Sequence, residues 1–147
     1  MPGYLISVIF LLSTLLPQST DSLLLRTFPL TGKLFHVAPS PFFQGRPYFL
    51  ELFIDIPPDS LESASIFFKT DSSLQFQALP LEKYRGRFRF RYDPQNLPSN
   101  TITYFFTATE KNFGLHATPL DTSGKIVPVT LRLVDPIKYY EARDRER

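Results

Sequence analysis

The feature that most constrains the fold of this chain is a two-residue alternation of side-chain type. Residues 84–92 read YRGRFRFRY, with an aromatic residue or glycine at every even position and arginine at every odd position. An α-helix would spread this pattern around its whole circumference, whereas a β-strand places the two residue types on opposite faces. The alternation therefore predicts an extended strand with one face packed against another layer.

The same alternation recurs along most of the chain. It is seen at residues 33–38, 48–56, 64–69, 74–79, 101–109, 115–118 and 125–134. Turn-forming residues separate these runs at intervals of about eight to twelve residues, which is typical of all-β folds. We expect a single antiparallel two-sheet sandwich of about seven strands, with 64–69 and 74–79 paired as a hairpin. Pro128 predicts that the last run is an edge strand or contains a bulge.

Composition removes several classes of function. The chain has 147 residues, the length of one ordinary domain, and no cysteine, which excludes disulfide frameworks, thiol catalysis and cysteine-ligated metals. A formal net charge of +2 is too small to indicate nucleic acid as a partner. No nucleophile elbow, phosphate-binding glycine loop or paired carboxylates for glycoside cleavage can be recognised, so we expect no enzyme; a hydrolase is the weakest alternative.

The N-terminus has the pattern of an export signal. Residues 4–16 are almost entirely apolar, and the polar run 17–22 follows them. This stretch is shorter than the roughly 20 apolar residues that span a bilayer, so we predict a signal peptide over residues 1–22 and a secreted or periplasmic protein without a transmembrane span after cleavage. Cleavage after Ser19 competes with cleavage after Ser22. An uncleaved anchor or a buried strand of the domain is the alternative, since residues 1–3 carry no lysine or arginine.

The layout resembles the immunoglobulin-like or fibronectin type III-like modules of bacterial exported proteins over about residues 33–134. The segments that carry the resemblance are the first strand running into Ala38-Pro39, YFLELFIDI at residues 48–56, and TITYFFTATEKNFGLHATP at residues 101–119. The resemblance implies a β-sandwich with a role in adhesion, spacing or partner docking, often next to another domain, and it supplies no active site. The cysteine pair and packed tryptophan of true immunoglobulin domains are absent.

Four arginines form the most unusual candidate site. On one strand face they would lie about 6.6 Å apart, as a row of cations able to meet phosphates, sulfates or carboxylates. These residues are Arg85, Arg87, Arg89 and Arg91. The functional hypothesis is capture of an anionic glycan or lipid headgroups.

A structural role for the arginines competes with that hypothesis. We expect residues 48–56 to form the neighbouring strand, which would offer carboxylates for cross-strand ion pairs and rings for guanidinium stacking. The carboxylates would be Glu51 and Asp55, and the rings Phe49 and Phe53. The row would then be neutralised within its own sheet.

Two aromatic residues fall on the polar face of their strands. Phe67 and Phe105 lie opposite the apolar majority, on strands that we expect to be sheet neighbours. As an exposed pair they would mark a docking surface for a protein. The alternative is that residues 23–30 or the C-terminal tail cover them. Phe42 and Phe43 are interpreted as loop anchors that pack on the rim of the core.

The remaining polar residues fit ordinary structural roles. His36 and His116 stand alone in apolar strands, so we expect no metal site. Asp93 and Asp121 fit turn chemistry better than calcium binding. We also expect no cofactor.

The tail, residues 135–147, switches to mixed charge. Its Tyr139 and Tyr140 either dock on a partner that orders the tail or belong to a solvated extension. The sequence as a whole predicts an exported, non-catalytic interaction module that docks a protein at the cell envelope or surface. The alternative is the anion-binding module. Residues 23–32 are taken as an extension that precedes the sandwich.

Overall fold

A computed structural model of the chain describes residues 33–146. The predicted signal peptide over residues 1–22 and the extension over residues 23–32 lie outside the described residues. Residues 33–132 contain only β-strands and loops, and one short helix follows them.

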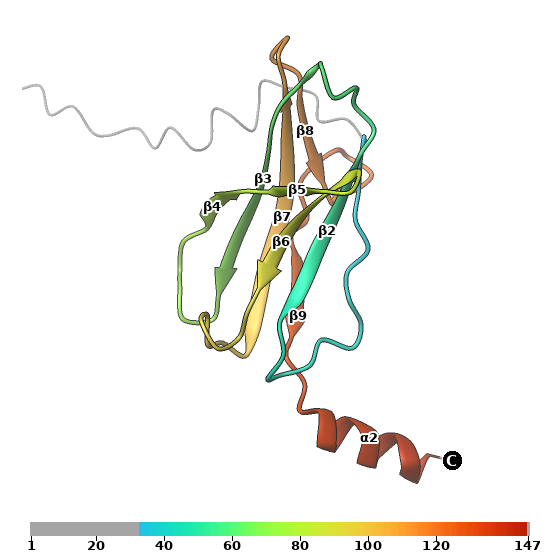
Figure 1. The fold of residues 1–147 in the computed structure, drawn as a ribbon. Helices are drawn as coiled ribbons and strands as arrows, with labels where there is room; N and C mark the ends of the chain where they lie inside the picture. Colours follow the sequence, from blue (N-terminus) through green and yellow to red (C-terminus); the bar gives the residue numbers. More distant parts are fainter. Residues whose placement is uncertain (1–32, 147) are drawn as a thin grey trace, which may run out of the picture.

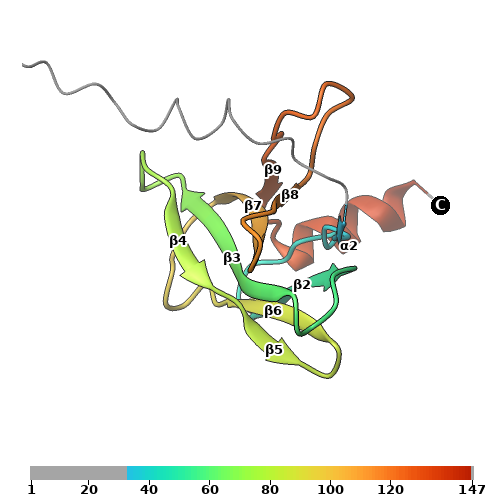
Figure 2. The ribbon, with the colours of Figure 1, turned by 90° about the horizontal axis from the view of Figure 1, so that it is seen from above.

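The strands form two antiparallel sheets packed face to face (Figures 1 and 2). The four-stranded sheet has the order β1 (Leu34–Phe35), β2 (Tyr48–Ile54), β6 (Arg87–Tyr92), β5 (Glu82–Tyr84). The five-stranded sheet has the order β4 (Gln77–Pro80), β3 (Leu61–Thr70), β7 (Thr101–Glu110), β8 (Leu115–Thr118), and β9 (Val129–Arg132) pairs with β7 as well. The predicted all-β two-sheet sandwich is confirmed.

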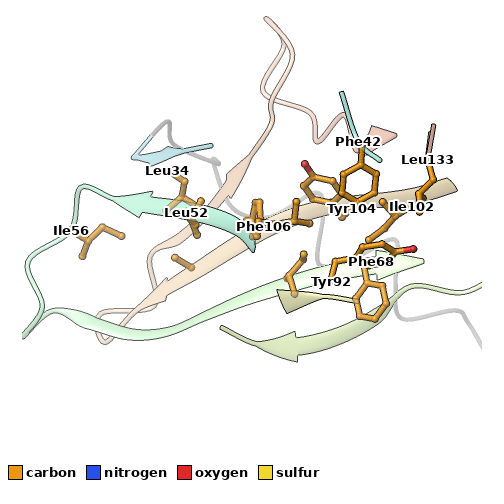
Figure 3. Close-up of a cluster of buried hydrophobic side chains, with 13 residues drawn as sticks. Leu34, Phe42, Leu52, Ile56, Phe68, Tyr92, Ile102, Tyr104, Phe106 and Leu133 are labelled. Carbon is orange, nitrogen blue, oxygen red and sulfur yellow. The ribbon is translucent and has the colours of Figure 1, made fainter. Parts of the chain in front are cut away.

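The core lies between the two sheets and is built by the alternating residues of each strand (Figure 3). In β7 every second side chain from Ile102 to Ala108 is buried, and the residues between them reach the outer face. The largest side chains without solvent exposure come from both sheets. They are Tyr92, Tyr104, Phe106, Leu50, Leu52, Ile66 and Ile102. The two-residue period therefore gives each sheet one face buried in the core and one face toward solvent.

The prediction of one continuous strand over residues 84–92 is wrong. Residues Arg85 and Gly86 form a turn, with φ angles of 45° and 79°, and the chain folds back as the hairpin of β5 and β6. Two successive residues with positive φ are the signature of the two-residue hairpin turn whose twist matches that of the flanking strands. Glycine adopts this conformation without strain and arginine does not, so only Gly86 signals the turn.

Four other strands, β1, β2, β4 and β9, are shorter than the alternation predicts, β1 and β9 most of all. The first run, 33–38, is a strand only at Leu34–Phe35. The last run, 125–134, contributes β9 only at Val129–Arg132, directly after Pro128. β9 has a single partner, β7, so the prediction of an edge strand is confirmed.

Two prolines limit further pairing at the edges of the five-stranded sheet. The Leu81 amide donates to the Ala64 carbonyl at 2.9 Å, a register that turns the backbone of Pro80 away from β3. By the same logic the bond from the Leu133 amide to the Asn100 carbonyl, at 2.8 Å, turns Pro128 away from β7. Because proline has no N–H, the free edges of β4 and β9 each lack a donor where an added strand would need one, whereas the third edge strand, β8, contains no proline.

Candidate functional site

Three phenylalanine rings gather on the outer face of the five-stranded sheet. Phe67 of β3 and Phe105 of β7 are directly opposite in register, and their rings stack with centroids 4.9 Å apart and planes 3° apart. Phe76, from the connection between β3 and β4, forms a T-shaped contact with Phe105, with ring centroids 5.3 Å apart. Phe67, Phe76 and Phe105 are called the phenylalanine cluster below. The two predicted residues are brought together, whereas the sequence pattern gave no sign of Phe76.

Small uncharged polar residues surround the phenylalanine cluster. The outward side chains nearest to it are Ser65 and Lys69 on β3, Thr103 and Thr107 on β7, Thr130 on β9, and Ala78 on β4, directly opposite Phe67. The hydroxyls of Thr103 and Thr130 are hydrogen-bonded at 3.0 Å. One cation lies close by, since the Lys69 ammonium is 5.0 Å from the centre of the Phe76 ring. An aromatic centre with a polar, charge-poor surround is the composition found at protein–protein interfaces.

The C-terminal tail packs elsewhere. It forms α2 (Pro136–Arg145), which begins where the Asp135 side chain accepts a hydrogen bond from the Ile137 amide, and α2 lies beyond the end of the sandwich (Figure 1). The rings of Tyr139 and Tyr140 contact Phe43 at 5.3 and 5.8 Å. These contacts place the tail away from the phenylalanine cluster, so the alternative that the tail covers Phe67 and Phe105 is wrong. The alternative that residues 23–30 cover them concerns residues outside the described range.

The interpretation of Phe42 and Phe43 as anchors on the core is confirmed. Both side chains are buried, although they lie in the loop between β1 and β2. Phe42 packs on Tyr48 and Tyr92, and Phe43 receives the two tail tyrosines. Tyr139 and Tyr140 thus contact this chain itself, and 53% of Tyr140 remains exposed.

Each of the three arginines of β6 forms an ion pair with a carboxylate of this chain. Arg87 Nη1 lies 2.8 Å from Glu51 Oε2 on β2. Arg89 Nε lies 3.1 Å from Glu82 Oε2 on β5, and Arg91 Nη2 lies 3.3 Å from Asp93 Oδ2. The predicted pairing with Glu51 is confirmed. Glu82 and Asp93 supply the other two carboxylates, in place of Asp55.

Aromatic rings hold the same arginines in position. The guanidinium carbon of Arg89 lies 3.7 Å from the Tyr84 ring centre and 4.5 Å from that of Phe49, so the cation is enclosed between two rings. Arg87 lies 5.8 Å from the ring centre of Phe53. The predicted stacking on Phe49 and Phe53 is confirmed. The contact of Tyr84 with Arg89 does not follow from a single strand over residues 84–92, because the turn places Tyr84 on the neighbouring strand β5. These contacts are cation–π interactions that also fix the guanidinium planes.

Arg85 does not belong to the predicted row. It occupies the turn between β5 and β6, where its guanidinium carbon lies 5.2 Å from the centre of the Tyr84 ring. The expectation of four arginines on one strand face is therefore wrong for Arg85. Its displacement follows from the positive φ angles of the turn.

A small apolar cleft lies beside this turn, at the open end of the sandwich. It has a volume of about 120 Å³. Its lining residues are Ile54, Ile56, Pro58, Leu61, Lys83, Gly86 and Phe88. At the opposite end of the strands, an open groove of about 540 Å³ is lined mainly by loop residues, including Asp71, Pro94, Pro98 and Asn100. In this groove the Asp71 carboxylate accepts hydrogen bonds from the backbone and side-chain amides of Asn100, and the Ser99 hydroxyl lies 2.6 Å from that of Tyr92.

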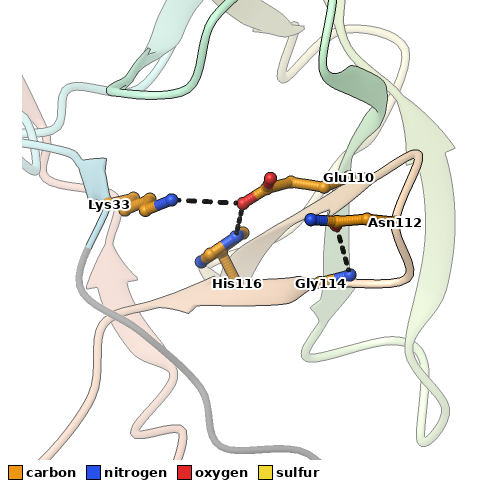
Figure 4. A network of polar contacts seen from close by, with 5 residues as sticks. All are labelled: Lys33, Glu110, Asn112, Gly114 and His116. Atoms are coloured by element: carbon orange, nitrogen blue, oxygen red, sulfur yellow. Dashed lines mark hydrogen bonds and ion pairs between the residues drawn. The ribbon is translucent and has the colours of Figure 1, made fainter.

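The histidines are bound to protein groups. His36 contacts the Glu51 carbonyl and the Tyr104 hydroxyl, each at 2.7 Å, and burial lowers its pKa. His116 lies 2.6 Å from the Glu110 carboxylate, which also receives Lys33 at 3.2 Å (Figure 4). The hydrogen bond from His116, followed by that from Lys33, holds the pKa of Glu110 below its usual value. Within residues 33–146, no three histidine, aspartate or glutamate side chains are grouped to hold a metal ion.

The two turn aspartates have the structural role that was predicted. Asp121 accepts hydrogen bonds from the Ser123 amide and hydroxyl and from the Lys125 amide, and these bonds, that from the hydroxyl first, lower its pKa. Asp93 accepts from the Gln95 amide at 3.1 Å. Both are Asx turns, in which the side chain completes the turn.

No family model and no curated protein matches the chain. One solved structure, titled "X-ray structure of the endo-beta-1,4-mannanase from Thermotoga petrophila", is similar at 10% identity with a TM-score of 0.47, over 70% of this chain and 20% of that one. The chain thus spans about a fifth of that protein. Among residues 33–146, no helix has the length and apolarity needed to cross a membrane.

Proposed function

We propose that this protein is an exported, non-catalytic interaction module that docks a protein partner at the cell envelope or surface. The partner binds to the phenylalanine cluster on the outer face of the five-stranded sheet. The observation that carries this proposal is the stacked pair of Phe67 and Phe105 inside a surround of serine and threonine. Phe67 and Phe105 are partly buried and Phe76 is 38% exposed, so a partner that covers the cluster removes its remaining apolar surface from water, which is favourable.

The geometry of the rings favours a protein over a sugar. Phe67 and Phe105 turn their faces toward each other, so they direct their edges outward. A sugar ring stacks on an exposed aromatic face, whereas protein side chains pack well against ring edges. Pro80 and Pro128 oppose strand addition at the β4 and β9 edges of this sheet, which favours docking on its face.

The strand order supports an immunoglobulin-like or fibronectin type III-like module. The orders β1-β2-β6-β5 and β4-β3-β7-β8 correspond to the ABED and C′CFG sheets of such sandwiches. Modules of this kind bind partners on the faces of their sheets, and the fold itself does not supply a catalytic site. Export rests on the predicted signal peptide, and the periplasm or the outside of the cell is the matching location.

The alternative function is binding of an anionic glycan or lipid headgroup by Arg85, Arg87, Arg89 and Arg91. Three of these arginines already have carboxylate partners, which reduces the charge available to a ligand. Retention of the protein on a sulfated or phosphorylated resin tests this alternative. Salt-sensitive retention that disappears when the four arginines become serine supports it, and retention that survives the change excludes it.

Site-specific photocrosslinking tests the docking function. A photoreactive phenylalanine analogue at Ser65 should capture a partner chain in extracts of the source organism, and the F67S/F105S variant should abolish that adduct. The same analogue at Lys125, in a distant loop, is the control. The solution mass of the purified protein then shows whether the captured chain is a second copy. An adduct that persists in F67S/F105S contradicts the proposal.

A further inference from the structure

Four exposed apolar side chains gather on the outer face of the four-stranded sheet, at the edge formed by β1 and β2. Phe35 of β1 lies directly opposite Phe53 of β2 in register, and Phe49 is on the same face of β2, four residues earlier. Val37 comes two residues after Phe35. The exposed fractions of these four residues lie between 45% and 90%. Phe35, Val37, Phe49 and Phe53 are called the apolar strip below.

The position of His36 shows why the sandwich does not bury the start of this strip. His36 stands between Phe35 and Val37 and points inward, where its Nε2 lies 2.7 Å from the Tyr104 hydroxyl of the opposite sheet. Successive side chains of an extended chain point to opposite sides, so Phe35 and Val37 point away from the core. The apolar strip is therefore an outward surface that the two sheets leave uncovered.

The chain enters the described range beside the apolar strip. The Asp55 amide donates a hydrogen bond to the Lys33 carbonyl at 2.9 Å, so Lys33 adjoins the end of β2. Lys33 is two residues from Phe35, and Asp55 is two residues from Phe53. The phenylalanine cluster, in contrast, lies on the outer face of the other sheet. The residues that precede Lys33 therefore join the domain next to the apolar strip.

Those preceding residues have the composition of a segment that needs apolar cover. Residues 23–30 read LLLRTFPL, in which Arg26 is the only charged residue. Gly32 follows, and glycine is the residue type that favours a reversal of the chain. A short linker holds a tethered segment at an effective concentration of about millimolar, so a modest apolar contact is enough to keep it in place.

We propose that residues 23–30, which lie outside the described residues, fold back over the apolar strip and cover it with their leucines and Phe28. Removal of both apolar surfaces from water is the driving force. The segment then occupies the outer face of the four-stranded sheet and leaves the phenylalanine cluster open to a partner. The inference goes beyond the proposed function and does not rest on it.

Disulfide trapping in the full chain tests the proposal. The chain has no cysteine, so T27C/V37C allows one intramolecular disulfide, between the segment and the apolar strip. The matched control carries L24S/L25S/F28S in addition and has the same linker. We expect the disulfide to form about tenfold faster without the serines, because the apolar contact raises the effective concentration of the two thiols. Equal rates would mean that the segment is tethered but not bound, and would overturn the proposal.

Substitutions on the two sheet faces locate the contact. F49S/F53S should slow trapping of the T27C/V37C pair, whereas F67S/F105S, on the other sheet, should leave the rate unchanged. Thermal unfolding of each variant in its reduced form checks that the sandwich is intact. The L24S/L25S/F28S control changes no residue of the sandwich, so its result holds even if F49S/F53S is unstable. Trapping that F67S/F105S slows and F49S/F53S does not would contradict the proposal.

Two other occupants of these surfaces give different products. T27C/S65C places the second thiol beside the phenylalanine cluster and should form its disulfide more slowly than T27C/V37C. A faster disulfide in T27C/S65C would place the segment on the phenylalanine cluster, and the proposal would be wrong. Covalent dimers of T27C/V37C as the main product on a non-reducing gel would mean that a second copy supplies the cover, which also refutes the proposal.

Discussion

The Tyr104 hydroxyl donates a hydrogen bond to Nε2 of His36, at 2.7 Å, from one sheet of the sandwich to the segment that follows β1. The other ring nitrogen, Nδ1, lies 2.7 Å from the Glu51 carbonyl, which only accepts, so Nδ1 carries the proton. Burial disfavours the charged form and lowers the pKa of His36, so the imidazole is neutral near pH 7. A neutral imidazole with its proton on Nδ1 accepts from the Tyr104 hydroxyl at Nε2.

Acid should therefore destabilise the protein through His36. The unfolded chain takes up a proton near pH 6.5 and the folded chain only at lower pH, so the free energy of unfolding falls as the pH drops below about 6.5. For one proton the slope cannot exceed about 1.4 kcal/mol per pH unit. Urea unfolding from pH 7.5 to 5 measures it, and the slope should be smaller in H36Q. Equal slopes in both proteins would exclude His36 as the source.

A second acid-sensitive contact should act at lower pH. The pKa of Glu110 is lowered in the folded protein by His116 and Lys33, so its contribution to stability is complete above the usual pKa of about 4.5 and is lost as the pH falls through the folded value. E110Q should be less stable than the wild type at pH 7, and the difference should shrink toward pH 3. Thermal unfolding at both pH values measures this. A difference that is independent of pH would show that the charge of Glu110 contributes nothing.

Neighbouring residues on β3 should respond very differently to truncation. Ile66 is fully buried between the sheets, whereas Phe67 lies half-buried on the outer face. I66A should cost about 2–5 kcal/mol of unfolding free energy, because it leaves a cavity. F67A should cost about 1 kcal/mol, mainly the stacking with Phe105. Chemical denaturation of both variants checks the order; comparable losses would mean that Phe67 is covered in the folded protein.

Arginine and lysine should not be interchangeable at residue 89. Arg89 lies between the rings of Tyr84 and Phe49, while 56% of the Arg91 side chain is exposed and its ion pair is with Asp93. R89K keeps the charge but loses the planar group that fits between the two rings. We expect R89K to lower the unfolding temperature more than the matched control R91K. Equal effects would show that the rings add nothing to the ion pair.

Several features of the candidate sites could be predicted because they depend on local pattern and on one adjacency. The alternation in β3 and β7 placed Phe67 and Phe105 on outer faces, and the assumption that these strands are neighbours brought the rings together. The same reasoning paired Arg87 with Glu51 and with the ring of Phe53. Each of these results follows from the period of two once the neighbouring strand is known.

Other features did not follow from the pattern. The chain reverses at Arg85 and Gly86, but arginine rarely adopts positive φ, so the alternation of residues 84–92 concealed the turn. The reversal places Tyr84 across from Arg87 and moves Arg85 off the strand face. The contact of Glu82 with Arg89 depends on this reversal, and that of Phe76 with Phe105 depends on the path of the connection between β3 and β4.

The sequence by itself determined which side of each strand is dry, because apolar side chains at every second position lose water only when one whole face is covered. Only the tertiary structure decided which cations remain unpaired and where the tail tyrosines rest. Lys83 lines an apolar cleft, Arg85 lies against the Tyr84 ring, and Tyr139 meets Phe43, because the sheet order and the hairpin turn set these contacts. Residue preferences act over a few positions, whereas these contacts depend on the register of strands far apart in the chain.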